Sequence, residues 1–302
     1  MHCAESPGGA DDFRMDNSEG NESKNGTARG VATLMASSLS NQLGAATGSL
    51  AFPVIGPLGV VAVRQLIAAA LLLPIARPRF RSFTRAQLWP VFLLAVVVAT
   101  MNLGLYSAIE RIGLGLAVTL EFLGPLSIAL YGALAGARST AGALCALAAA
   151  AGVLAITQPG PSTDYLGIGM GLVGAASWAA YILLNRTIGA RIPGIQGTAA
   201  ALAVSAAAFL PVAVVILLSR PVSWFTILCA AAAGVLASAV PYIADLLALR
   251  RVPAGLFGML MSVNPVFAAL IGLAMGQALN PLQWAGILVI VGANAAVLRL
   301  GR

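Results

Sequence analysis

The chain has 302 residues and a formal net charge of +7; 59% of its residues are hydrophobic and only 9% are charged. Because a soluble domain carries about 25% charged residues, this composition excludes an ordinary soluble enzyme or binding domain. The longest uncharged stretch, from Val252 to Leu298, would be about 70 Å long as one helix, more than twice the roughly 30 Å hydrocarbon core of a bilayer. The sequence therefore predicts an all-α membrane protein with many spans, since a helix satisfies its own backbone hydrogen bonds in lipid.

The chain begins with a segment unlike the rest. Residues 1–30 are rich in Gly, Ser, Asn, Asp and Glu, which predicts a disordered tail. Beyond it, short turns marked by Pro, Gly or Arg separate ten predicted membrane-spanning helices. We place these helices near residues 31–51, 57–76, 88–109, 113–135, 139–158, 165–185, 195–218, 225–248, 254–275 and 281–299.

The basic residues predict the orientation. With a cytoplasmic N-terminus, the outer loops carry only Arg111 and Arg220, whereas the inner segments hold nearly all the other basic residues. The positive-inside rule therefore places both termini, and the tail, in the cytoplasm and the protein in the cytoplasmic membrane. The basic residues are scattered over separate loops without an aromatic platform, so we expect membrane lipid and no nucleic acid as their partner.

An internal repeat predicts the architecture. A shift of 140 residues aligns residue types that are uncommon in so apolar a chain: Arg111 with Arg251, Gly115 with Gly255, Pro125 with Pro265, and Gly132 with Gly272. The two predicted repeats, 31–158 and 165–300, hold five helices each, and an odd number inverts the second repeat relative to the first. Secondary transporters commonly use this arrangement, with the binding site between the halves near mid-depth. Pro125 and Pro265 are expected to kink their helices and are candidate hinges.

Three ionisable residues fall inside predicted spans, namely Arg64, Glu121 and Asp245. Each costs at least about 2.5–3.5 kcal/mol at a helix centre, so they are expected to face the interior and to have partners. Arg64 and Glu121 lie at similar depth from the outer side and are predicted to meet. Asp245 comes just before Arg250 and Arg251, so we expect it near the inner surface, extended toward water or paired with those arginines.

Two long blocks of sequence carry a family resemblance: "MNLGLYSAIERIGLGLAVTLEFLGPLSIAL" from Met101 and "VPYIADLLALRRVPAGLFGMLMSVNPVFAALIG" from Val240. With these blocks the chain resembles, over about residues 31–300, the EamA branch of the drug/metabolite transporter superfamily. Within that branch it is most similar to threonine/homoserine exporters. The resemblance implies a cytoplasmic-membrane exporter of small hydrophilic amino acids driven by the proton gradient. By position it carries over Gln42, Arg64, Glu121 and Asp245 as polar sites.

The sequence departs from this family at two positions. Such exporters usually have a glutamate at the position of Asn264, and the best-known members have a lysine at that of Ser49. An asparagine cannot take up a proton, so a coupling role at that position would move, most plausibly to Glu121, unless this member has another substrate or stoichiometry.

The residue types suit an amino-acid substrate, which presents a carboxylate and an ammonium. Arg64 offers a planar fork for the carboxylate, and Glu121 can hold the ammonium or a proton, so that the two compete and antiport results. Candidate neutral contacts are Gln42, Asn102, Tyr181, Tyr242 and Asn264. Structural interpretations stay open: a static Arg64–Glu121 ion pair, a structural Asp245, amide bonds between helices and tyrosines that only pack.

Other chemistry finds little support in the sequence. The one histidine is His2, the cysteines Cys3, Cys145 and Cys229 are far apart, and the single lysine, Lys24, belongs to no P-loop. We therefore expect no metal, no cofactor and no enzymatic activity, and an amino acid and protons as partners. The alternatives are an exporter of cationic drugs or other metabolites, which Arg64 and the 6% aromatic content disfavour, and a non-transporting membrane scaffold.

Overall fold

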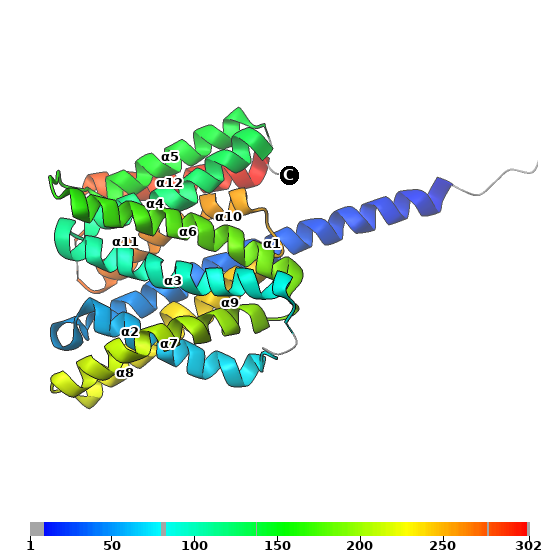
Figure 1. The fold of residues 1–302 in the computed structure, drawn as a ribbon. Helices are drawn as coiled ribbons and strands as arrows, with labels where there is room; N and C mark the ends of the chain where they lie inside the picture. Colours follow the sequence, from blue (N-terminus) through cyan, green and yellow to red (C-terminus); the bar gives the residue numbers. More distant parts are fainter. Residues whose placement is uncertain (1–8, 80–82, 137, 277, 301–302) are drawn as a thin grey trace, which may run out of the picture.

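The computed structural model describes residues 9–79, 83–136, 138–276 and 278–300, and within them all side chains except those of residues 9–25, 110, 114 and 115. The described residues form a bundle of helices and no strand, which confirms the all-α prediction (Figure 1). In chain order the helices are α1 (Gly9–Ser49), α2 (Phe52–Ala76), α3 (Arg85–Ile112), α4 (Leu114–Tyr131), the π-helical turn η2 (Gly132–Gly136), α5 (Thr140–Thr157), α6 (Tyr165–Arg191), α7 (Gln196–Ser219), α8 (Trp224–Gly234), the π-helical turn η3 (Val235–Ala239), α9 (Val240–Leu249), α10 (Ala254–Leu260), α11 (Val263–Ala274) and α12 (Pro281–Leu300).

Nine helical segments in the described part of the chain are long and apolar enough to cross a membrane. They correspond to the second to tenth predicted spans and are Phe52–Ala76, Arg85–Ile109, Leu116–Gly136, Thr140–Thr157, Tyr165–Arg191, Gln196–Ser219, Trp224–Leu249, Ala254–Ala274 and Pro281–Leu300. The first predicted span, 31–51, lies within α1 and is not among them. Serines, threonines, Asn41 and Gln42 interrupt its apolar residues, so the count of ten spans stays a prediction.

Helix α1 is continuous across residue 30, where the predicted tail and first span meet. Its N-terminal part extends away from the bundle, and its C-terminal part passes between the other helices (Figure 1). Residues 1–8 of the predicted tail lie outside the described residues, and the disorder predicted for 1–30 stays a prediction.

Glycines let helices approach closely at two places in the bundle. A Cβ added at Gly255 of α10 would lie 2.9 Å from the Cα of Gly132, at the end of α4, so only glycine fits there. A Cβ added at Gly44 of α1 would lie 2.5 Å from the backbone nitrogen of Ala237 in η3. The second of these contacts brings α1 and η3 together beside the polar residues described below.

Two of the predicted spans are single segments in the sequence but broken in the structure. The eighth predicted span consists of α8, η3 and α9, and the ninth consists of α10 and α11 with a break at Met261 and Ser262. Pro241 and Pro265 follow these irregular turns and cannot donate the α-helical hydrogen bond to the carbonyls four residues earlier, those of Ala237 and Met261.

Candidate functional site

Arg64 of α2 is half-buried and joins three helical segments. Its Nη2 donates to the carbonyl oxygen of Ala237 at 2.6 Å, its Nε donates to Ser238 Oγ at 3.2 Å, and its Nη1 donates to the Tyr106 hydroxyl on α3 at 3.3 Å. All three acceptors are neutral. The positive charge of Arg64 is therefore not neutralised by any carboxylate among the described residues.

The predicted pairing of Arg64 with Glu121 is wrong. The one ion pair among the described side chains joins Arg111 to Asp164, and the guanidinium of Arg64 reaches η3 and α3 instead. The reason lies in Pro241: it has no N–H for the carbonyl of Ala237, which is left free to accept from Arg64. Similar depth in the membrane did not place Arg64 and Glu121 on facing sides of their helices.

Glu121 is buried in α4, with 7% of its surface exposed. Within the described part of the chain its carboxylate has no hydrogen-bond or ion-pair partner. It faces α6, where a Cβ added at Gly174 would lie 3.7 Å from its Cγ. A buried carboxylate without a protein partner needs a proton or a cation from elsewhere to compensate its charge.

Asp245 is buried in α9 and holds three helices together. Ser37 of α1 donates its hydroxyl to Oδ1 at 2.7 Å, and Tyr181 of α6 donates to Oδ2 at 3.0 Å. The predicted extension toward water and the predicted pairing with Arg250 and Arg251 are therefore wrong, whereas the predicted depth near the inner surface stays a prediction. Residues five apart point about 140° apart around a helix, so Arg250 lies on another side of α9.

Tyr242 connects the surroundings of Arg64 and Asp245. Its hydroxyl lies beside the side chains of Gln65 and Asn102, and both Arg64 and Asp245 act on it electrostatically. Its ring packs against that of Tyr181 with centroids 5.9 Å apart. Four of the predicted residues and Asp245 thus belong to one polar cluster, which we call the central cluster: Arg64, Asn102, Tyr181, Tyr242 and Asp245.

Of the other predicted residues, Glu121 lies outside the central cluster, and Gln42 and Asn264 form a separate pair. Gln42 of α1 donates its amide to Asn264 Oδ1 at 3.4 Å. Asn264 in turn donates to the carbonyl of Met261 at 3.1 Å, which Pro265 leaves without its α-helical partner. Asn264 therefore has a local structural role at the break between α10 and α11.

Four residues that contact or adjoin the central cluster were not predicted from the sequence: Ser37, Gln65, Tyr106 and Ser238. Gln65 is 1% exposed, and its Oε1 is buried without a hydrogen-bond partner. A usable signal was the position of Gln65 directly after Arg64 in an apolar span. Serine is too common in transmembrane helices to have singled out Ser37 or Ser238.

The loop ends of α3 and α6 carry a separate, exposed ion pair. Arg111 Nε lies 3.0 Å from Asp164 Oδ2, and the backbone N–H of Gly167 donates to Asp164 Oδ1 at 2.9 Å. The Gly167 N–H, with help from Arg111, holds the pKa of Asp164 below its ordinary value. No group of three or more His, Cys, Asp or Glu residues able to hold a metal ion occurs among the described residues.

The comparisons with known proteins are consistent in family and fold. A sequence model of the EamA-like transporter family matches residues 165–299. The threonine/homoserine exporter RhtA of Escherichia coli (strain K12) is 30% identical over 268 residues, which cover 87% of this chain and 89% of that protein. The exporter of the same name from Salmonella typhimurium (strain LT2) matches to the same extent. A solved structure described as "Crystal structure of protein" has a TM-score of 0.73 at 21% identity and covers 91% of this chain and 98% of its own, which shows the fold alone.

Proposed function

Because the chain belongs to the EamA-like transporter family, we propose that it exports small amino acids of the threonine or homoserine kind across the cytoplasmic membrane. The observation that carries the proposal is the 30% identity to RhtA over 87% of the chain. The family consists of membrane transporters and not of enzymes, and this chain is accordingly a multi-pass membrane transporter.

The central cluster supports a zwitterionic substrate. Arg64 bonds only to neutral oxygens, those of Ala237, Ser238 and Tyr106. A substrate carboxylate is a stronger acceptor for a guanidinium than a hydroxyl, because both partners are then charged. Replacing the Ser238 and Tyr106 contacts by a carboxylate would keep the Ala237 contact as an anchor.

Glu121 and Asp245 supply the negative side of the site. Neither has a cationic partner among the described residues, and both are buried. In the proposed mechanism Glu121 holds either the substrate ammonium or a proton, so that release of one accompanies binding of the other. Proton antiport follows from this competition, with Asp245 as a second candidate for the coupling acid.

Alternating access is proposed from the predicted repeat. The 140-residue shift pairs α2 with α7, α4 with α10 and α5 with α12, and each of these helices packs directly against its own counterpart. Such self-paired contacts are those expected around a pseudo-two-fold axis between inverted halves, where one half can rock against the other. Five spans in each half would put both termini on one side of the membrane, and the positive-inside rule predicts that this side is the cytoplasm.

Growth and efflux test this proposal. The chain is expressed in a bacterium that lacks its own threonine and homoserine exporters, and growth is scored at toxic concentrations of these amino acids and of cationic dyes. We expect protection against the amino acids and faster efflux of labelled homoserine than with an empty vector. Protection against the dyes alone would contradict the proposal and favour a drug exporter.

A further inference from the structure

Gln65 of α2 has a side-chain oxygen that no donor in the described part of the chain uses. The side chain is 1% exposed, and its Oε1 is buried without a hydrogen-bond partner. A buried amide oxygen without a donor costs free energy, because it has lost its hydrogen bonds to water and gained none in the protein. Such a group in a folded protein needs an explanation, and one explanation is a ligand that supplies the missing donor.

This oxygen belongs to a side chain next to the charge of Arg64. Gln65 follows Arg64 directly in α2, and its side chain lies beside the Tyr242 hydroxyl, on which Arg64 acts electrostatically. A Cβ added at Gly234, the last residue of α8, would lie 3.4 Å from the Cα of Arg64, so α2 packs closely against the helix that leads into η3. The guanidinium and the amide of Gln65 are therefore both near the Tyr242 hydroxyl.

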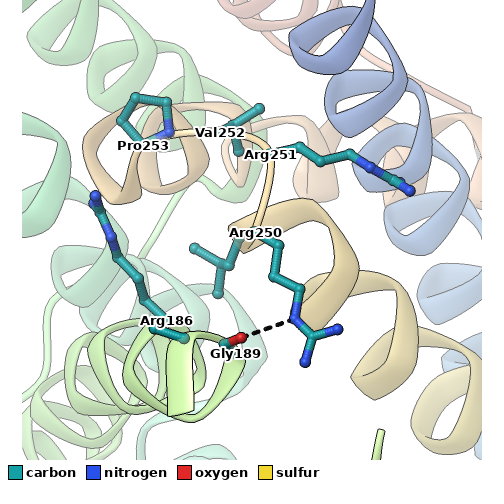
Figure 2. A pocket seen from close by; sticks show the side chains of 8 residues that line it. Arg186, Gly189, Arg250, Arg251, Val252 and Pro253 are labelled. Atoms are coloured by element: carbon teal, nitrogen blue, oxygen red, sulfur yellow. Dashed lines mark hydrogen bonds between the residues drawn. The ribbon is translucent and has the colours of Figure 1, made fainter. Parts of the chain in front are cut away.

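The helix that carries Tyr242 is held at its C-terminal end. Arg250, directly after α9, donates to three carbonyls at and just beyond the end of α6, among them that of Gly189 at 3.1 Å (Figure 2). The pocket beside this connection has a volume of about 410 Å³, and its other two arginines, Arg186 and Arg251, point to opposite sides of the connection (Figure 2). Arg250 thus fixes α9, and with it Tyr242, against α6.

An amino acid bound by Arg64 would bring its side chain close to the unused oxygen of Gln65. In the proposed function Arg64 holds the substrate carboxylate, and in threonine or homoserine a hydroxyl lies within a few ångströms of that carboxylate. A hydroxyl donates one hydrogen bond, which Oε1 lacks, whereas a methyl group donates none. Because Oε1 is buried, water does not replace a missing donor, and a substrate without the hydroxyl is disfavoured.

We propose that Gln65 Oε1 accepts a hydrogen bond from the side-chain hydroxyl of the substrate. Gln65 is then the residue that selects hydroxylated amino acids over apolar ones of the same size. This inference rests on the proposed function, because it needs the substrate carboxylate on Arg64. It gives the third group of the substrate a partner, in addition to Arg64 for the carboxylate and a buried acid for the ammonium.

Competition in inside-out membrane vesicles tests the proposal. Uptake of labelled homoserine is driven by an imposed pH gradient, and unlabelled homoserine or norvaline, in which a methyl group replaces the hydroxyl, is added as competitor. In the unaltered protein, half-inhibition should need about tenfold or more norvaline than homoserine. In Gln65→Met, which keeps the length of the side chain but removes the amide, this ratio should fall to near one. Gln65→Leu, a second apolar variant, should behave in the same way.

Asn294→Leu is the matched control. Asn294 of α12 is also a buried amide whose Oδ1 has no partner, but its Nδ2 donates to Ser262 Oγ, outside the central cluster. This variant should keep the ratio of the unaltered protein.

Two outcomes would overturn the proposal while leaving the proposed function in place. One is equal inhibition by norvaline and homoserine in the unaltered protein. The other is an unchanged ratio in Gln65→Met and Gln65→Leu, because a purely structural Gln65 would weaken both competitors alike. A lack of homoserine uptake by the unaltered protein would overturn the proposed function itself, and this inference with it.

Discussion

Arg64 Nη2 donates a 2.6 Å hydrogen bond to the carbonyl oxygen of Ala237, which lies four residues before Pro241. In an ordinary helix that carbonyl would accept from the backbone N–H of residue 241, but proline has none. The arginine thus satisfies a backbone group that the proline leaves free, and the proline in turn positions the arginine.

The same relationship recurs twice in this bundle. Pro265 removes the α-helical donor to the carbonyl of Met261, which instead accepts from the backbone N–H of Asn264 at 3.0 Å and from Asn264 Nδ2 at 3.1 Å. Pro90 frees the carbonyl of Ala86, which accepts from Arg191 Nη1 at 3.0 Å. In each case a polar side chain donates to a carbonyl whose α-helical donor a proline has removed.

Pro241→Ala is expected to lower export without lowering thermal stability. The new N–H would compete with Arg64 for the carbonyl of Ala237, so Arg64 would lose its shortest contact. Efflux of labelled homoserine and the melting temperature are the two measurements. Pro211→Ala in α7 is the control, since Pro211 is also inside a helix but outside the central cluster. Equal efflux in the two variants would contradict the role given to Pro241.

Arg64→Lys should weaken substrate binding while the protein still folds. An ammonium keeps the charge but cannot span Ala237, Ser238 and Tyr106 with one planar group. We expect the KM for export to rise by about tenfold or more, or about 1.4 kcal/mol, with a smaller change in the maximal rate. Arg220→Lys, directly after the C-terminal end of α7 and outside the central cluster, should leave the KM unchanged. A lowered maximal rate at constant KM would point to a purely structural Arg64.

Glu121→Gln should abolish proton-driven export and leave the fold intact. The carboxylate has no protein partner to lose, so an amide of the same size should not lower the melting temperature. Homoserine transport in vesicles with an imposed pH gradient measures the coupling. Retained gradient-driven transport would exclude Glu121 as the coupling acid, and a melting temperature lowered by several degrees would show that its charge is structural.

Ser37→Ala should destabilise the protein by about 1–3 kcal/mol, because it removes one of the two hydroxyl donors to the buried Asp245. Ser38→Ala is a closely matched control. Ser38 is also buried, but its hydroxyl has no hydrogen-bond partner, so its removal should cost little. Unfolding in denaturant measures the free energy of unfolding of both variants. An equal decrease in the two would show that the hydrogen bond from Ser37 to Asp245 does not stabilise the protein.

Asp164→Asn should change the pH dependence of stability only in acid. The Gly167 N–H and Arg111 lower the pKa of Asp164 in the folded protein, below about 3.9 in the unfolded chain. The stabilisation is therefore fully present above the unfolded pKa and is lost as pH falls through the folded pKa. Melting temperatures of the two proteins should differ by a constant amount above about pH 5 and converge below about pH 4. A difference that grows in acid would contradict this sign.

The sequence predicted the all-helical fold and the nine helical segments in the described part of the chain that are long and apolar enough to cross a membrane, because hydropathy and helix length are local properties. It also singled out Arg64, Glu121 and Asp245, since charge inside an apolar segment is visible without coordinates. The partners predicted for Arg64 and Asp245 were wrong, because the contacts of a side chain depend on the direction in which it points from its helix. Arg64 binds η3 and not Glu121, and Asp245 binds Ser37 and Tyr181 and not the arginines after it.

The irregular turns were the other unpredicted feature. Pro125 and Pro265 were expected to kink their helices, and the chain does break just before Pro265, whereas α4 continues through Pro125. Among the described side chains, none donates a hydrogen bond to the carbonyl of Glu121, whose α-helical donor Pro125 removes. What a proline does to a membrane helix thus depends on the side chain that a neighbouring helix offers, and a single sequence does not show that.

The π-helical turn η3 has an effect on everything that follows it in its span. Such a turn inserts one extra residue, which advances the register of α9 by about 100° relative to α8. Deleting one residue between Val235 and Ala239 would rotate Asp245 out of reach of Ser37 and Tyr181 while leaving the length and hydropathy of the span almost unaltered. The direction in which Asp245 points from the axis of α9 therefore depends on a single residue inserted before it in the chain.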